Sequence, residues 1–203
     1  MKLFYSPGAC SLAPHIVLRE AGLAADLVRV DLSTKKTEHG EDFRNINPKG
    51  YVPALVLDAG GILTEAAVIV QYLADLAPDK KLIPVTGGME RYKLMEWLNF
   101  ISTELHKSFG ALFNPNTPQA WREMVQQMTS RRLDFVAKSL QGQPYLMGSS
   151  FMAADAYLFT VLSWTAHLNI DLSGWPVLKE YLARVAGRPA VRQTLAEEGL
   201  LKG

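Results

Sequence analysis

The sequence predicts a small mixed α/β domain followed by an all-helical domain. Short segments with the apolar runs or alternation typical of strands fall before residue 79, interleaved with two helical segments. A polar stretch containing proline and glycine follows at 79–88. From Met89 onward apolar residues recur at helical spacing and strand signals nearly vanish. We therefore expect one domain at 1–78, a linker at 79–88 and a helical domain at 89–203.

The first elements form a β-α-β unit. Residues 2–5 are a short apolar run that ends at a Ser-Pro-Gly turn signal. The segment 11–22 is predicted to be a helix that ends at its glycine, with Pro14 tolerated because it lies in the first turn. Residues 27–32 alternate between apolar and polar types, as a half-buried strand does. A polar loop is expected at 33–42.

A β-β-α unit completes this domain. Residues 52–57 are a second β-rich run, followed by an Asp-Ala-Gly-Gly turn. The segment 62–77 predicts a short strand and then a helix that is capped near Thr64 and ends before Pro78. This order predicts a mixed sheet with helices packed on it. About five helices are expected in the second domain.

Composition argues against several functions. Hydrophobic residues make up 48% and charged residues 20%, an ordinary globular balance. The 21 basic and 20 acidic residues give a net charge of +1, so we expect no nucleic-acid partner. No window approaches the roughly 18 apolar residues that a membrane span needs, and no signal peptide is evident. The single cysteine cannot form an internal disulfide, which predicts a cytoplasmic location.

Cys10 is the first candidate for chemistry. It follows a turn and directly precedes a helix, whose partial positive charge stabilises a thiolate. One interpretation is a reactive or ligand-contacting thiol. The other is a small buried apolar side chain, the commoner state of a lone cysteine. Position alone leaves both open.

Three more positions of the first domain could meet a ligand. Tyr5 ends the first strand, although a core ring is the more usual role. A cis bond at Val52-Pro53 would offer neighbouring backbone to an extended peptide, although most such bonds are trans. Glu65 opens a helix whose N–H groups can receive a carboxylate, but plain capping explains the same residues.

In the helical domain, Asn99, Thr103 and His106 fall at i, i+4 and i+7 and so share one polar face. The imidazole of His106 suits proton transfer, and Lys107 adds a charge nearby. A solvated stripe would show the same spacing. No zinc or other metal site is expected, because the remaining histidines have no partner at metal-ligand spacing: His15, His39 and His167.

Five segments in order resemble a known family, the bacterial beta-class glutathione S-transferases: KLFYSPGACSLAPHIVLRE, NPKGYVPALVLD, LTEAAVIVQYLAD, ERYKLMEWLNFISTELHK and ADAYLFTVLSW. The match is collinear and covers essentially the whole chain. Each motif is weak alone, but their order and spacing are specific. The resemblance implies the glutathione transferase fold, with a thioredoxin-like N-terminal domain and an all-helical C-terminal domain. It also implies a homodimer.

The resemblance implies roles by position. Cys10 matches the cysteine that marks this class, close to the glutathione sulfur and able to form a mixed disulfide with it. His106 and Lys107 match polar residues near the sulfur, so Cys10 and His106 are the predicted catalytic residues. Val52, before an expected cis Pro53, matches the residue whose backbone pairs with the cysteinyl unit of glutathione.

The remaining glutathione contacts follow from the same resemblance. Lys35 matches a basic residue at the glycyl end, and Glu65 with Ala66 matches the helix start that holds the γ-glutamyl end. Further positions line the site, partly across the dimer interface: Asn99, Thr103, Glu104, Leu105 and His106. Tyr5 aligns with the sulfur activator of other classes.

Two positions depart from the family pattern. Ala66 stands where the superfamily commonly has serine, so a hydroxyl contact is lost while the backbone N–H remains. Met152 stands where the family usually has serine or threonine as a helix N-cap. Losing such a cap typically lowers stability by about 1 kcal/mol. Asp155 can still bond back to the backbone and supply half of a capping box. We expect lower stability rather than lost activity.

The resemblance implies an enzyme that conjugates the glutathione thiolate to small hydrophobic electrophiles, with glutathione as co-substrate. The sequence does not decide between detoxification, peroxide reduction and a catabolic step as its physiological role. An alternative is a glutathione-dependent thiol–disulfide oxidoreductase that uses Cys10 by a monothiol route. A non-enzymatic binding protein with the same fold is a third interpretation. The electrophile is not identified, and the candidates for its pocket are also ordinary helical core residues: Phe109, Phe113 and Trp164.

Overall fold

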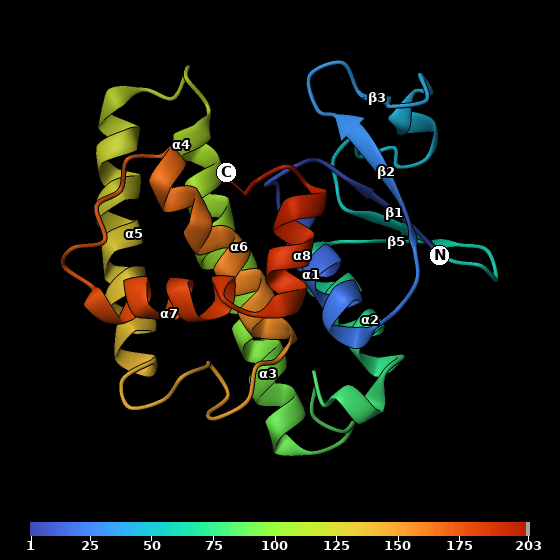
Figure 1. The fold of residues 1–203 in the computed structure, drawn as a ribbon. Helices are drawn as coiled ribbons and strands as arrows, with labels where there is room; N and C mark the ends of the chain where they lie inside the picture. Colours follow the sequence, from blue (N-terminus) through green and yellow to red (C-terminus); the bar gives the residue numbers. More distant parts are fainter. Residues whose placement is uncertain (202–203) are drawn as a thin grey trace. The chain divides into compact units, whose positions relative to one another are not determined.

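The computed structural model describes residues 1–201, and the chain forms two compact units. The sheet unit comprises Met1–Ile83 together with the chain from Gly187 onward. The helical unit comprises Pro84–Ala186. Figure 1 shows the strands in the N-terminal part of the sequence and long helices in the remainder.

A five-stranded mixed sheet organises the sheet unit, in the order β3-β2-β1-β4-β5. Strand β1 pairs in parallel with β2, and the other three pairings are antiparallel. This confirms the predicted β-α-β and β-β-α order. The strands are β1 (Lys2–Tyr5), β2 (Asp26–Asp31), β3 (Lys36–Thr37), β4 (Ala54–Val56) and β5 (Ile62–Thr64).

Strand β3 corrects the loop predicted at 33–42. Its two residues, Lys36 and Thr37, pair with Asp31 and Val30 of β2. Two residues are too few to show the alternation by which a strand is recognised, and one of them is a charged side chain. The prediction was therefore wrong for this short edge strand.

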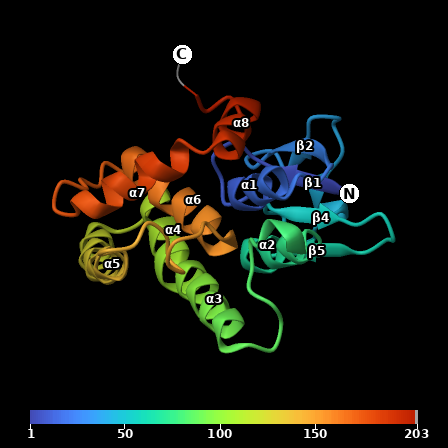
Figure 2. The ribbon, with the colours of Figure 1, turned by 60° about the horizontal axis from the view of Figure 1, so that its bottom comes forward.

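The central strand β1 is buried on both faces. Phe4 belongs to a cluster that includes Phe43 of the 3-10 helix Phe43–Asn45, with ring centroids 5.5 Å apart. Leu3, fully buried, points to the opposite face because side chains alternate along a strand. Helices α1 (Leu12–Ala21) and α2 (Ala66–Asp75) pack on each other and cover that face (Figure 2).

The helix ends of this unit follow local rules with one exception. Helix α1 ends at Gly22, whose φ of 69° is left-handed, as predicted. The N-cap position of α2 is Glu65, next to Thr64 as predicted, but the Glu65 side chain makes no capping hydrogen bond. A short 3-10 helix, Pro78–Lys80, follows. The C-terminal helix α8 (Pro189–Glu197) packs on α1.

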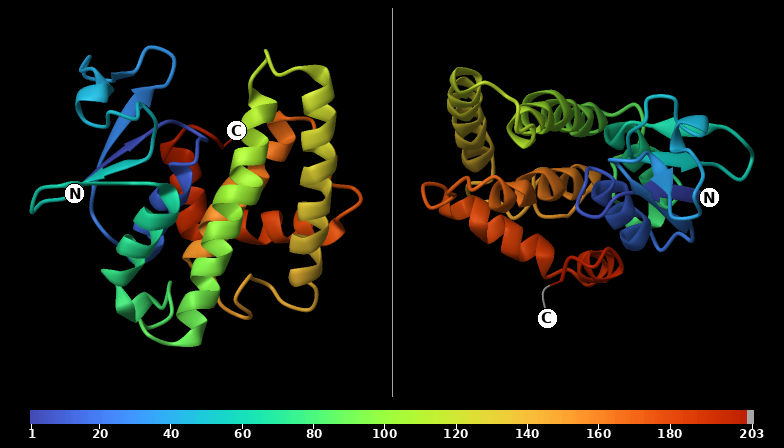
Figure 3. Two further views of the ribbon diagram at one scale, coloured as in Figure 1. Left: turned by 180° about the vertical axis from the view of Figure 1, so that it is seen from behind. Right: turned by 90° about the horizontal axis from the view of Figure 1, so that it is seen from above.

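The helical unit contains one long, continuous helical rod made of three consecutive segments. Helix α3 (Met89–Phe100) continues through a π-helical segment, Ile101–His106, into α4 (Lys107–Phe113). Figure 3 shows this rod beside α5 (Gln119–Ser139). The unit also contains α6 (Ala153–His167) and α7 (Pro176–Ala186). Together with α8, the residues described after Met89 form five helical rods, which agrees with the prediction.

Helix α6 is the core of the helical unit, and Asp155 fixes its start. The fully buried carboxylate of Asp155 accepts the backbone N–H groups of Met152 and Leu146, both at 2.9 Å, and the hydroxyl of Tyr181 at 3.0 Å. The expected half of a capping box is therefore confirmed. Burial, followed by the nearby charge of Asp155, raises the pKa of Tyr181 well above its usual value.

Across residues 1–201, no helix has the length and apolar character that crossing a membrane requires.

Replacing Met152 with threonine should stabilise the protein. Met152 has φ −133° and ψ 173°, the backbone of an N-cap, so a hydroxyl there can accept an N–H of the first helical turn. The free energy of unfolding should be about 1 kcal/mol higher for Met152→Thr than for Met152→Val, the control in which the introduced side chain has the same shape but no hydroxyl. Urea denaturation measures the difference. Equal stability of the two variants would contradict the capping argument.

Thr129 generates a second stability prediction. Its hydroxyl, in a side chain that is 1% exposed, has no hydrogen-bond partner among the described residues. Thr129→Val should therefore raise the free energy of unfolding by about 1 kcal/mol. Thr160→Val is the matched control, since the equally buried hydroxyl of Thr160 donates to a helical carbonyl at 2.9 Å. In thermal unfolding, a higher melting temperature for Thr160→Val than for Thr129→Val would refute this prediction.

Candidate functional site

The structure brings Cys10 against Val52. Cys10 lies in the turn between β1 and α1, and its thiol donates to the carbonyl oxygen of Val52, with 3.3 Å between sulfur and oxygen. The peptide bond between Val52 and Pro53 is cis, as the family resemblance implied. The side chain of Val52 is buried, at 2% exposed, while Cys10 is half-buried. Val52 therefore offers its backbone rather than its side chain.

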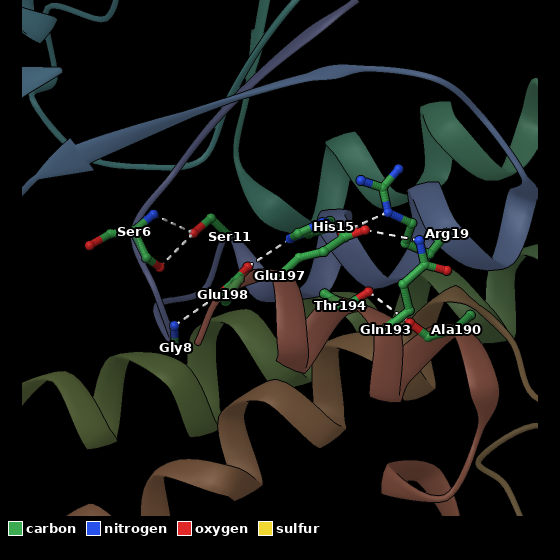
Figure 4. Close-up of polar contacts among 10 residues, drawn as sticks. All are labelled: Ser6, Gly8, Ser11, His15, Arg19, Ala190, Gln193, Thr194, Glu197 and Glu198. Atoms are coloured by element: carbon green, nitrogen blue, oxygen red, sulfur yellow. Dashed lines mark hydrogen bonds and ion pairs between the residues drawn. The ribbon is translucent and has the colours of Figure 1, made fainter. Parts of the chain in front are cut away.

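The turn that carries Cys10 is closed by two serines. The hydroxyl of Ser11 accepts the N–H of Ser6 at 3.1 Å and donates to the carbonyl of Ser6 at 3.2 Å. The N–H of Ala9 also donates to that carbonyl, at 3.0 Å. Figure 4 shows the two contacts between Ser6 and Ser11. Together these bonds occupy the backbone groups of the short loop that carries Cys10 to the start of α1.

Residues at the C-terminal end of helix α8 bind this turn and helix α1. The N–H of Gly8 donates to Glu198 at 2.8 Å, and the other oxygen of Glu198 lies 2.9 Å from Nδ1 of His15. Nε2 of His15 lies 2.8 Å from Glu197, which also accepts from Arg19 at 2.8 Å (Figure 4). The side chains of His15 and Glu198 are fully buried. Sequence reasoning missed this network, because Gly8 and Glu198 are 190 positions apart.

Tyr5, the residue aligned with a sulfur activator of other classes, ends β1. Its ring centroid lies 5.8 Å from that of His15. Burial, and then the negative charge of Glu198, raises the pKa of the Tyr5 phenol. The phenol is therefore a neutral group at physiological pH.

The start of α2 carries a cluster of polar groups. The carboxylate of Glu65 accepts from Nζ of Lys49 at 2.5 Å and from the hydroxyl of Tyr51 at 3.4 Å. The bond to Glu65 raises the pKa of Lys49. The Glu65 side chain does not cap the helix, and Ala66 is its first residue. Lys49 and Tyr51 were missed in the sequence, although both lie in the segment NPKGYVP that precedes the cis bond.

Lys35 lies beside this segment. Its backbone is left-handed, with φ 59°, and is held by hydrogen bonds of 2.8 Å to Asp31 and from Phe43. The Lys35 side chain passes Gly50 so closely that a Cβ at Gly50 would lie 4.0 Å from it. Lys35 is half-buried and belongs to the sheet unit, as Glu65 and Cys10 do. Its side chain lies beside Gly50, the residue that follows Lys49.

In the helical unit, the predicted site residues differ in burial. Asn99 and Thr103 are exposed, and the Thr103 hydroxyl donates to the Asn99 carbonyl at 3.0 Å. Glu104 accepts from Arg132 at 2.7 Å. Leu105 is fully buried, so only its backbone is available to a ligand.

His106 does not continue the exposed stripe of Asn99 and Thr103. Its Nδ1 lies 2.7 Å from the hydroxyl of Tyr157 on the buried helix α6. The π-helical segment Ile101–His106 changes the spacing, because a π-helix bonds i to i+5. The face deduced from a 3.6-residue period therefore does not extend to His106. Such π segments are frequent at functional sites.

An aromatic cluster surrounds His106. The ring of Trp164 lies 4.9 Å from that of His106, 5.6 Å from Phe113 and 6.4 Å from Phe109, each in an edge-to-face arrangement. Phe113 is 48% exposed, whereas Phe109 and Trp164 are buried. The three candidates for an electrophile pocket therefore share one cluster with His106.

Among residues 1–201, no group of three or more His, Cys, Asp or Glu side chains is placed to hold a metal ion.

A thioredoxin-like sheet with a cysteine at the start of α1, facing a residue before a cis proline, and a second unit made of helices define a glutathione transferase fold. Comparison with known proteins agrees. The chain matches the N-terminal domain of the glutathione S-transferases over residues 8–76 and their C-terminal domain over residues 100–189.

Individual relatives cover nearly the whole chain. Glutathione S-transferase GstA of Escherichia coli O157:H7 is 48% identical over 98% of this chain and 100% of its own. A ternary complex of BphK, a bacterial glutathione transferase, is 56% identical with a TM-score of 0.97, over 98% and 100% of the two chains. The bacterial beta-class enzyme of Sphingomonas chungbukensis is 48% identical with a TM-score of 0.95, over 99% and 100%. The chain belongs to the glutathione S-transferase family and is similar to its bacterial beta class.

Glu198→Gln should loosen the turn that carries Cys10. The amide has one oxygen and no charge where the carboxylate has two charged oxygens, so the charge-assisted contacts to Gly8 and to Nδ1 of His15 are not both kept, at a cost of about 1–3 kcal/mol. Glu197→Gln is the control, because the Glu197 side chain is 29% exposed and should cost less. Urea unfolding compares the two, and the KM for glutathione should rise only for Glu198→Gln. Equal effects of both substitutions would show that the buried contact to Gly8 is unimportant.

Proposed function

We propose that this protein conjugates the thiolate of glutathione to small hydrophobic electrophiles. The observation that carries the proposal is the contact between the Cys10 thiol and the Val52 carbonyl, beside the cis Pro53, in a member of the glutathione S-transferase family. The thiol–disulfide alternative uses the same cysteine, but nothing in the geometry favours it over conjugation.

Binding would use three features of the sheet unit. Backbone groups of Val52 would pair with the cysteinyl unit of an extended peptide. The N–H groups at the start of α2, from Ala66, would receive the γ-glutamyl carboxylate, because a helix N-terminus favours an anion, and Glu65 would accept its ammonium. Lys35 would pair with the glycyl carboxylate.

Further contacts would come from the helical unit, partly across a dimer interface. Asn99 and Thr103 offer exposed polar groups, Glu104 a carboxylate, and Leu105 only its backbone. His106 and Lys107 would lie near the sulfur. The cluster of Phe109, Phe113 and Trp164 would receive the electrophile.

The chemistry requires the glutathione thiol to ionise. Hydrogen-bond donors and positive charge near the sulfur favour the thiolate, and the start of α1 with His106 would supply them. The thiolate then attacks the electrophilic carbon, forming a C–S bond as the leaving group departs with the electrons of its bond to carbon. The thiol proton passes to water.

We further propose a cytoplasmic homodimer that serves detoxification and binds neither membrane nor nucleic acid. Apolar side chains exposed on α3 and α5 support self-association: Met95 is 41% and Phe135 50% exposed, and Phe135 contacts Trp97 and Phe100. We propose 1–78 as the glutathione-binding domain, 79–88 as the linker and 89–203 as the helical domain, whose last helix α8 packs on α1.

Conjugation of glutathione to a chloronitrobenzene tests the proposal. The wild type should show a clear rate, Cys10→Ala should retain part of it, and Cys10→Ala/His106→Gln should lose at least about tenfold more, because both donors to the sulfur are gone. Ser130→Ala, on the exposed surface of α5, is the control and should match the wild type.

The contradicting results are distinct. An unchanged rate in the double variant would refute the roles of Cys10 and His106. Absence of conjugation in the wild type, together with disulfide-reductase activity that disappears in Cys10→Ser, would favour the oxidoreductase.

A further inference from the structure

Tyr157 and His106 form a short contact within the helical unit. The hydroxyl of Tyr157 lies 2.7 Å from Nδ1 of His106, and the two rings meet edge to face at 88° with centroids 5.9 Å apart. Tyr157 is 1% exposed and lies in the middle of α6, whose residues on both sides are buried. A hydroxyl so deeply buried requires a hydrogen-bond partner, and Nδ1 is within reach.

The chemistry of the two groups decides the direction of this bond. A neutral imidazole carries one N–H donor and one nitrogen acceptor, and the bond made by one nitrogen sets the state of the other. A phenol donates readily, and an imidazole nitrogen is a better acceptor than a phenolic oxygen. This difference favours donation from the Tyr157 hydroxyl to Nδ1, which would leave the ring proton of His106 on Nε2.

We propose that Tyr157 is a positioning residue that holds His106 as the Nε2–H tautomer, so that His106 donates a hydrogen bond to the glutathione thiolate and does not remove the thiol proton. This inference rests on the proposed function, which places His106 near the sulfur. Trp164, with its ring 4.9 Å from that of His106, limits rotation of the imidazole and supports the same orientation. The thiol proton leaves to water, and the C–S bond forms as the leaving group departs.

Nitrogen NMR of protein labelled with ¹⁵N-histidine reads the tautomer directly. The chain contains four histidines, so His106→Gln identifies the His106 signals by their loss. The wild type at neutral pH should show the Nε2–H pattern, and Tyr157→Phe should convert it to a mixture of tautomers. A wild-type Nδ1–H pattern, or an Nε2–H pattern unchanged in Tyr157→Phe, would overturn the inference whatever the activity.

Kinetics then test the consequence. Tyr157→Phe should lower kcat for a chloronitrobenzene about fivefold, leave the KM for glutathione within about twofold, and move the rise of the pH–rate profile to higher pH. Tyr181→Phe is the matched control, since it removes another buried hydroxyl, one bonded to Asp155. It should reduce stability without moving the pH profile. Equal pH profiles for Tyr157→Phe and Tyr181→Phe would contradict a positioning role.

The two levels of the proposal fail differently. If wild-type protein does not conjugate glutathione, or His106→Gln conjugates at the wild-type rate, the proposed function or the role of His106 fails while the NMR result stands. If conjugation depends on His106 but the tautomer does not depend on Tyr157, the positioning role fails and the proposed function stands.

Discussion

The antiparallel pairing of β1 with β4 is the constraint on which the candidate site depends. Phe4 lies opposite Ala54, so the residues after β1 and those before β4 meet at one end of the sheet. Cys10 and Val52 come into contact there, 3.3 Å apart. A shift of one residue would turn Leu3 and Phe4 to the wrong faces, and because both are buried, the core fixes the register. Burial in the sheet thereby sets the geometry of the thiol.

Distant parts of the chain then hold the loops that the sheet positions. Glu198 of the segment after α8 contacts both Gly8 in the turn before α1 and His15 within α1, so it holds the turn to the helix. In the helical unit, the π-helical segment turns His106 toward α6, where Tyr157 meets it. Each proposed catalytic group is thus supported by a buried partner, and such support is what keeps a reactive side chain in one orientation.

Local patterns predicted much of this fold, and the reasons are visible in single elements. The end of α1 was predictable because Gly22 suits a left-handed cap, and β1 because its apolar run stops at a turn. Strand β3 was missed, since two residues carry no period. The site residues came from family resemblance, because each spacing has an ordinary structural explanation. The contacts of Glu198 with Gly8 and of Tyr157 with His106 join positions 190 and 51 apart, which no local pattern encodes.

The most direct test of the central claim is the ionisation of bound glutathione. Ultraviolet difference spectra, recorded as the pH is raised, follow the thiolate of glutathione in complex with the protein and of free glutathione. Donors and positive charge at the sulfur predict a bound thiol pKa clearly below that of the free peptide. A bound thiol that titrates at the same pH as free glutathione, with binding shown to be saturated, would contradict the claim that this site activates the sulfur.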